Sequence, residues 1–293
     1  MAAALPPVQR IVSMDVLRGI AVLGILLANI SVFCAPAMEM QTAWSVLKPS
    51  PDEAWAHAVR EALVSGKMRA MLALLFGAGL WMQYSKMAAQ DQLAAERGDP
   101  KKLWPKKYAV RTALLLALGA IHGVFIWFGD ILAIYAICAF ITIPFVKVSD
   151  KVLAWIIGGC LAFGLVVGGG LGALVQSGLS QMGPETPFIG AASEAKIYAQ
   201  DGYLMQTLHR VIILALNSFN FLFMAPPIFA MFLGGMMLAR RGLFRAEGTA
   251  SSDLSKMLKI GLGIGIPLNL IPIALRFFDL PPYATFAVEF CFA

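Results

Sequence analysis

The chain has 293 residues, of which 59% are hydrophobic and only 14% are charged. A soluble globular domain is usually about half apolar and about a quarter charged, so this composition excludes an ordinary soluble domain and favours a protein embedded in lipid. The formal net charge of +6 would suggest a nucleic-acid partner for a soluble protein. In a membrane protein it reflects lysine and arginine in cytoplasmic loops, so we expect the lipid bilayer as a partner and no nucleic acid.

Apolar segments recur along the whole chain. A transmembrane helix needs about 20 apolar residues to cross the hydrocarbon core. We therefore predict an all-α fold, a polytopic transmembrane helix bundle of about seven spans in one domain over residues 1–293. The predicted spans cover residues 14–33, 64–84, 108–128, 131–145, 152–174, 219–239 and 257–275.

The apolar region 208–239 is too long for one straight span, and it contains Pro226 and Pro227. Proline lacks a backbone N–H and clashes with the preceding turn, so it kinks or breaks a helix. The prediction here is an interfacial amphipathic stretch up to about Asn217, followed by the sixth span.

The last apolar run, residues 283–293, is too short to cross a membrane. We expect it to be an incomplete eighth span, and the domain to be truncated at its C-terminus.

The distribution of positive charge predicts an orientation. The loop between the second and third spans is the densest basic segment, and basic loops lie in the cytoplasm. Counting spans from this loop places the N-terminus in the cytoplasm. The basic residues of this loop and of the first turn of the third span are Lys86, Arg97, Lys101, Lys102, Lys106, Lys107 and Arg111.

The four cysteines, Cys34, Cys138, Cys160 and Cys291, lie in apolar surroundings without C-x-x-C or histidine spacing. They predict neither a disulfide framework nor a metal site.

Ionisable residues inside apolar spans are costly and therefore mark candidate sites. Asp15 and Arg18 are three residues apart at the start of the first span, so they share a helix face and can pair. One interpretation is an interfacial ion pair, with Arg18 reaching lipid phosphates. The other is a site for an anion or for the phosphate of a cofactor.

His122 lies within the third predicted span, and Asp130 follows eight residues later. On a continuous helix the two would be roughly 12 Å apart along the axis, so contact requires the chain to bend near Gly129. A histidine in the membrane can act as a general base, because its ordinary pKa lies near neutrality. Alternatively, it forms a structural hydrogen bond to a neighbouring helix.

Several motifs occur in order along the chain and resemble the YeiB-like family of bacterial inner-membrane proteins. They are Ser13–Ile30 with its D-x-x-R-G pattern, Leu74–Gly79, Gly119–Gly123, Gly129–Leu132 with Tyr135-Ala136, Gly234–Met237 and Arg241–Leu243.

The resemblance implies a relationship to transmembrane acyltransferases, which move an acyl group from a cytosolic acyl-CoA or acetyl-CoA to a small-molecule or glycan acceptor. It implies that Arg18, with Asp15 and Asn29 on the same span, helps to hold the cofactor. Asn29 stands where the acyltransferase-3 enzymes have a histidine. His122 is then the candidate base, and Asp130 tunes it or positions the acceptor.

A second hypothesis is a transporter or permease in which Asp15, Arg18, His122 and Asp130 line a polar pathway. The broken apolar region around Pro226 favours it, because discontinuous helices often form transport sites. A third is a membrane partner without catalytic activity. The sequence does not indicate an oligomeric state.

Overall fold

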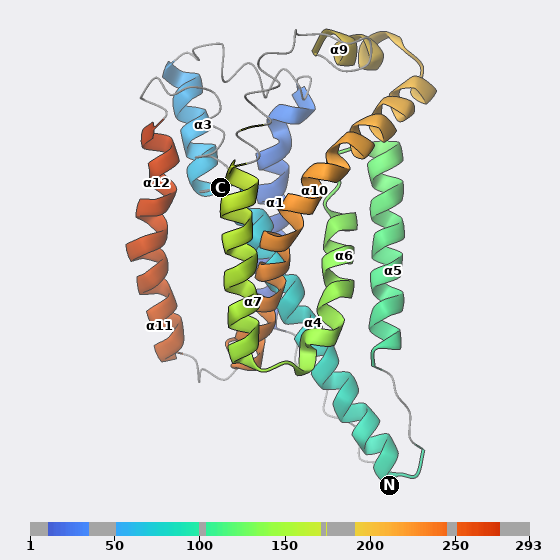
Figure 1. The fold of residues 1–293 in the computed structure, drawn as a ribbon, viewed down its shortest axis with the longest axis vertical. Coiled ribbons are helices and arrows are strands. Elements are labelled where there is room, and N and C mark those ends of the chain that lie inside the picture. Colours follow the sequence, from blue (N-terminus) through green and yellow to red (C-terminus); the bar gives the residue numbers. More distant parts are fainter. Residues whose placement is uncertain are drawn as a thin grey trace.

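The computed structural model describes residues 11–34, 51–99, 104–170, 174, 191–244 and 251–275, and in these ranges the regular elements are helices. Figure 1 shows them side by side as an elongated bundle. The elements are α1 (Val12–Cys34), α3 (Pro51–Leu63), α4 (Lys67–Glu96), α5 (Lys106–Ile121), the π-helical η1 (His122–Ile126), α6 (Leu132–Thr142), the 3-10 helix η2 (Ile143–Lys147), α7 (Asp150–Phe163), η3 (Gly164–Gly169), α9 (Ala191–Gln200), α10 (Tyr203–Arg240), α11 (Ser251–Ile260), η4 (Gly261–Gly265) and α12 (Ile266–Leu275).

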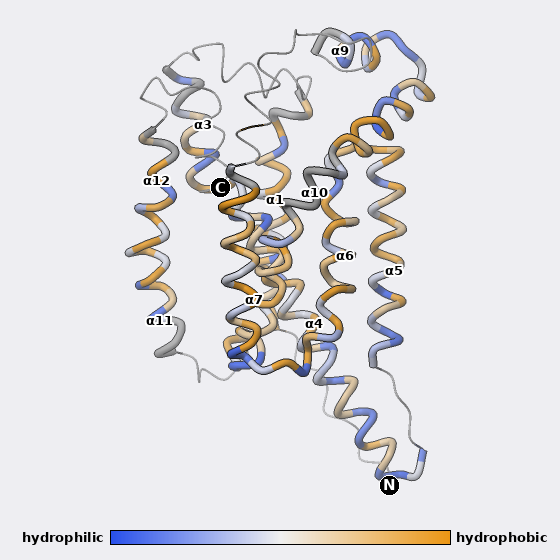
Figure 2. The backbone as a smooth tube through the Cα atoms, viewed as in Figure 1, coloured by the Kyte–Doolittle hydropathy of each residue, from blue (hydrophilic) through white to orange (hydrophobic). Residues whose placement is uncertain are grey.

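Four described segments are long and apolar enough to cross a membrane, namely Val12–Ile30, Ala58–Glu96, Lys106–Ile126 and Asp150–Val167. Three shorter apolar helical segments accompany them: Leu132–Lys147, Tyr203–Leu216 and Ala225–Arg240. Figure 2 shows hydrophobic residues along the middle of the bundle and hydrophilic residues on the lower part of α4. The prediction of a helical membrane protein is supported, whereas the number of about seven spans is not confirmed. The predicted eighth span lies outside the described residues.

Large apolar side chains cover the outside of the bundle. Leu23 on α1, Leu114 on α5 and Val166 on η3 are each more than half exposed. Such a surface would be unfavourable in water but is stable against lipid tails.

The predicted break before the sixth span is wrong. One continuous helix, α10, runs through both Pro226 and Pro227 for 38 residues. Gly164 makes room for the second proline, since a Cβ there would lie 2.6 Å from the Pro227 ring. Figure 1 shows α10 crossing the upper part of the bundle obliquely and then descending beside α4 and α7, with which it makes its most extensive contacts.

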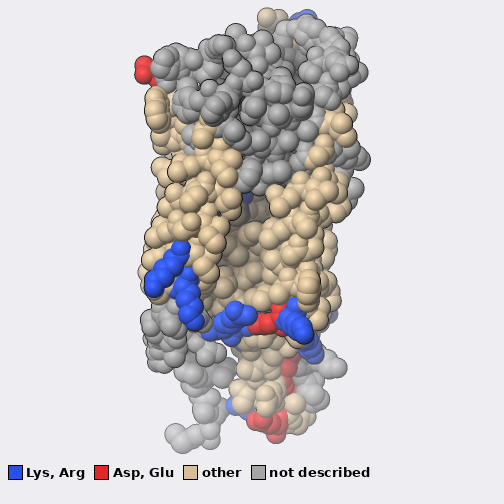
Figure 3. Space-filling view, turned by 60° about the vertical axis from the view of Figure 1, so that its left-hand side comes forward, with Lys and Arg blue, Asp and Glu red and all other residues tan. Residues whose placement is uncertain are grey.

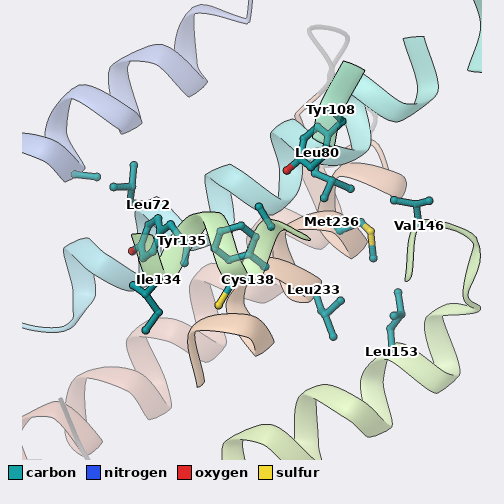
Figure 4. Close-up of a cluster of buried hydrophobic side chains, with 14 residues drawn as sticks. Leu72, Leu80, Tyr108, Ile134, Tyr135, Cys138, Val146, Leu153, Leu233 and Met236 are labelled. Atoms are coloured by element: carbon teal, nitrogen blue, oxygen red, sulfur yellow. The ribbon is translucent and has the colours of Figure 1, made fainter. Parts of the chain in front are cut away.

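Glycines let α4 and α10 cross in close contact. A Cβ at Gly77 would overlap the backbone of Phe232, and a Cβ at Gly235 would overlap the backbone of Leu74. Tyr135 of α6 is fully buried beside this crossing, with its ring edge-on to Phe232. Figure 4 shows the surrounding core, to which α4, α6, α7 and α10 contribute Leu72, Leu80, Tyr135, Cys138, Leu153, Leu233 and Met236.

Arg240 closes the turn between α6 and α7. Its guanidinium pairs with Asp150 Oδ1 at 3.1 Å and lies 4.8 Å from the centre of the Trp81 ring. It also donates hydrogen bonds to the carbonyls of Phe145, Val146 and Val148 at 3.0, 2.6 and 2.6 Å. These carbonyls lie at the end of η2 and just after it, where the chain leaves the helix. We call this end of the molecule, with Lys147, Lys151, Arg240 and Arg241, the basic end. Figure 3 shows a band of basic and acidic side chains across the lower part of the molecule, below a surface on which few charged side chains are seen.

We expect Arg240→Ala to lower the free energy of unfolding by about 2 kcal/mol, because several carbonyls lose a charged donor at once. The measurement is thermal unfolding of the purified protein in detergent. Arg241→Ala is the matched control, since Arg241 is 59% exposed and its nearest contact with Asp150 is 3.5 Å. Exposed pairs contribute about 0–1 kcal/mol. Equal effects of the two substitutions would contradict the role given to Arg240.

Candidate active site

His122 and Asp130 meet where the chain turns from α5 into α6. The helix widens into the π-helical η1 at His122 and ends at Ile126, and Trp127 is extended, with φ −155° and ψ 127°. The chain then reverses and places Asp130 Oδ1 3.0 Å from His122 Nδ1. The separation of roughly 12 Å holds only for a continuous helix, which this is not.

Both carboxylate oxygens of Asp130 are engaged. Oδ2 accepts a hydrogen bond from the amide of Ala133 at 2.8 Å, in the first turn of α6. A carboxylate at this position satisfies a free N–H group and interacts favourably with the helix dipole. The Asp130 side chain is 3% exposed and that of His122 is 34% exposed. With an ionised carboxylate on Nδ1, a neutral His122 ring carries its proton there and leaves Nε2 as a free acceptor.

Two glycines allow this close approach. A Cβ at Gly119 would overlap the Ala133 backbone and lie 2.9 Å from Asp130 Oδ2. Gly123, one turn further, faces Asp130 and Leu214, with a Cβ there at 3.5 Å from Asp130 Cβ. The spacing of four residues places both glycines on the helix face that meets α6.

The end of α1 packs against the same turn. The Trp127 ring folds over Gly129 and meets Phe33 edge-on, with ring centroids 4.9 Å apart. Asn29 precedes Phe33 by four residues, so it lies on the same face of α1, and its side chain is half-buried. Asn29 is therefore one helical turn from the contact between α1 and the α5–α6 turn.

Arg18 lies in a different part of the bundle from His122. Its Nη1 is 3.3 Å from Asp15 Oδ1, and the two side chains are 40% and 36% exposed. The guanidinium rests against α4 at Gly79, where a Cβ would be 3.2 Å from Nη2. Fifteen residues separate Arg18 from Phe33, which is roughly 22 Å along a helix. The expected Asp15–Arg18 pairing is present, but Arg18 and His122 have separate partners.

Two further residues that contact this turn come from α10, and their contact with the turn was not predicted. Arg210 Nε donates a hydrogen bond to the Val124 carbonyl at 2.9 Å, and the Tyr203 hydroxyl donates to the Phe125 carbonyl at 2.6 Å. Arg210 is 3% exposed, so the protein encloses its side chain almost completely. The sequence feature that could have pointed to this contact is an arginine at the start of a long apolar stretch.

No group of three or more His, Cys, Asp and Glu side chains that could hold a metal ion occurs among the described residues.

The chain is similar to two curated proteins. It is 31% identical over 273 residues to the uncharacterized protein YeiB of Escherichia coli (strain K12), covering 92% of this chain and 65% of YeiB. It is 27% identical over 282 residues to the uncharacterized protein YxaH of Bacillus subtilis (strain 168), covering 90% of this chain and 66% of YxaH. The chain thus spans about two thirds of the length of these relatives. No family model and no solved structure matches it. The two similarities support the resemblance to YeiB-like proteins.

Proposed function

We propose that this chain, similar over most of its length to YeiB and YxaH, belongs to a membrane-bound acyltransferase of the bacterial inner membrane. The observation that carries the proposal is the hydrogen bond between His122 and a buried, doubly held Asp130. This arrangement orients a histidine as a general base. A third of the His122 side chain remains exposed, which leaves room for an acceptor to reach its ring.

The pair supplies base catalysis for acyl transfer. His122 Nε2 removes the proton from an acceptor hydroxyl or amine as that atom attacks the acyl carbonyl of a thioester. The carbon–sulfur bond breaks, and His122 returns the proton to the leaving CoA sulfur. Asp130 stabilises the imidazolium formed between these steps without being protonated itself. The products are the acylated acceptor and free CoA, and the acceptor class we propose is a small molecule or a glycan.

Arg18 is the proposed contact for the anionic part of acyl-CoA or acetyl-CoA, entering from the cytoplasm. One turn before it, Met14 packs with Ala239 and Phe244, next to the basic end. The basic end is the cytoplasmic one in this proposal, with the N-terminus inside. A flexible acyl-pantetheine arm can connect an anchor near Arg18 to a base further along the bundle. Asn29, on the helix that joins the two regions, is proposed to contact this arm.

To bind the phosphates of the donor, Arg18 must give up its ion pair with Asp15. Substitutions of Arg18 and of Asp15 should therefore change the affinity for acetyl-CoA in opposite directions. We expect Arg18→Ala to weaken acetyl-CoA binding about tenfold, the loss of roughly one charged hydrogen bond. In place of the expectation that Asp15 helps to hold the cofactor, we propose that it competes for Arg18, so Asp15→Asn should strengthen binding by releasing the guanidinium. Binding is measured by titration calorimetry on the full chain in nanodiscs.

Arg241→Ala is the control for this titration, since it removes an equally charged but exposed arginine. Unchanged affinity in Arg18→Ala would remove Arg18 from the donor site. If the wild-type protein neither binds acetyl-CoA nor releases CoA from it, with water as the acceptor, the acyltransferase proposal itself fails.

A transport function loses the feature that favoured it, because α10 is continuous through Pro226 and Pro227. We therefore retain acyl transfer as the single proposed function.

A further inference from the structure

We propose that Arg210 and Tyr203 are positioning residues for His122, so that α10 is part of the site. We call residues 203–216 the outer arm of α10. This inference rests on the proposed function, in which His122 is the base. What it states about the structure is that the two residues set the orientation of the His122 ring relative to Asp130. Neither residue contacts His122 directly through a hydrogen bond in the structure; both act on the backbone that follows it.

The backbone after His122 needs donors from outside the helix. The last carbonyls of a helix have no intrahelical partners, and lipid supplies none. The His122 carbonyl is satisfied by the amide of Trp127 at 2.9 Å, which closes the π turn. The next residues lose their helical partners because the chain becomes extended at Trp127. The carbonyls of Val124 and Phe125 accept hydrogen bonds from Arg210 and Tyr203 instead.

Arg210 is itself held in place. Its Nη2 donates a hydrogen bond to Thr207 Oγ1 at 2.9 Å, and its guanidinium carbon lies 5.2 Å from the centre of the Tyr203 ring. A buried guanidinium with both of these contacts has few rotamers left, so the direction in which Nε points is fixed. The donor to the Val124 carbonyl is therefore a rigid one.

The outer arm touches three successive residues of the turn. Leu214 packs against Gly123, Arg210 binds the Val124 carbonyl and Tyr203 binds the Phe125 carbonyl. These are the residues directly after His122. The dihedral angles of this turn set where Asp130 lies relative to the His122 ring, and the start of α6 fixes the Asp130 carboxylate itself. The distance of 3.0 Å between the two side chains thus depends on α10.

The inference is tested by measuring the tautomer of His122 with nitrogen-15 NMR. The sample is the full chain, labelled at its histidines and reconstituted in nanodiscs. Comparison with His122→Gln assigns the signals. In the wild type, Asp130 selects the Nδ1–H form, whereas a free neutral imidazole favours the Nε2–H form. We expect Arg210→Ala to lower the ratio of Nδ1–H to Nε2–H about tenfold, as for the loss of one ordinary hydrogen bond. Tyr203→Phe should lower it less, and Arg210→Lys should restore part of it by keeping a donor.

Thr207→Val should lower the ratio by less than Arg210→Ala, because it removes one support of Arg210 but neither of the two donors to the turn. A wild-type tautomer ratio in both Arg210→Ala and Tyr203→Phe would overturn the inference. If Arg210→Ala does not fold, Tyr203→Phe decides alone, since it removes one hydroxyl from a side chain that is 59% exposed. Measuring the tautomer ratio requires no catalytic turnover, so the two proposals can fail separately. A protein that shows the expected tautomer ratios but releases no CoA would refute the proposed function and leave the positioning role intact.

Discussion

Asp130→Asn is expected to lower acyl transfer by about 10²–10⁴-fold, the contribution of a positioned base, while the helices stay folded. The upper end of this range is the loss found when the carboxylate behind a catalytic histidine is replaced by an amide. The measurement is the rate of CoA release from acetyl-CoA by the full chain in proteoliposomes, combined with its thermal unfolding.

The reason lies in the two contacts of Asp130. Its Oδ2 accepts from the Ala133 amide and its Oδ1 faces His122 Nδ1. Asparagine can keep the first contact with its single carbonyl oxygen, and its NH₂ group then faces the ring. Because NH₂ is a donor, it forces the proton of His122 onto Nε2, and the base is lost.

Asp150→Asn is the control for this substitution. It makes the same change of charge at the basic end, where the Asp150 side chain is 37% exposed, and turnover should stay close to wild type. Asp130→Ala should also lose the helix cap, which typically costs a further 1 kcal/mol or so of stability. Wild-type turnover in Asp130→Asn would exclude the pair as the catalytic base.

Gly235→Ala is expected to destabilise the protein by about 3 kcal/mol or more, the upper range for overpacking in a filled core. The added methyl group would overlap the backbone of Leu74. A backbone cannot rotate away as a side chain does, so α4 and α10 must separate along their crossing. The measurement is the shift in thermal unfolding in detergent.

The adjacent Gly234→Ala is the matched control. A Cβ at Gly234 has only the Leu74 Cδ2 atom at 3.4 Å, the flexible end of a side chain. Its effect should stay within about 1 kcal/mol, since alanine is also the better helix former. Similar losses of stability for the two glycines would argue against the close crossing of α4 and α10.

The helices of this protein follow from its sequence because long apolar runs can satisfy their backbones in lipid only as helices. The path of α10 does not follow from local rules. Pro226 and Pro227 predict a break, but the helix continues through both, and Gly164 of a neighbouring element gives the Pro227 ring room to pack.

The sequence predicted His122 and Asp130 as candidate site residues but did not predict their contact. His122 and Asp130 stood out as ionisable groups in apolar surroundings. Their contact depends on a π turn and a chain reversal that residue spacing does not encode. Arg210 and Tyr203 reach the turn from 78 to 86 residues away, a non-local contact that helix periodicity cannot indicate.

The most direct test of the proposed base is the rate of CoA release from acetyl-CoA by His122→Gln in proteoliposomes. A positioned general base contributes about 10²–10⁴-fold to the rate, so a loss of that size is expected while acetyl-CoA binding is kept. The control is His57→Gln, which replaces another histidine of the chain, one that lies in α3. A wild-type rate of CoA release in His122→Gln would contradict the assignment of His122 as the base.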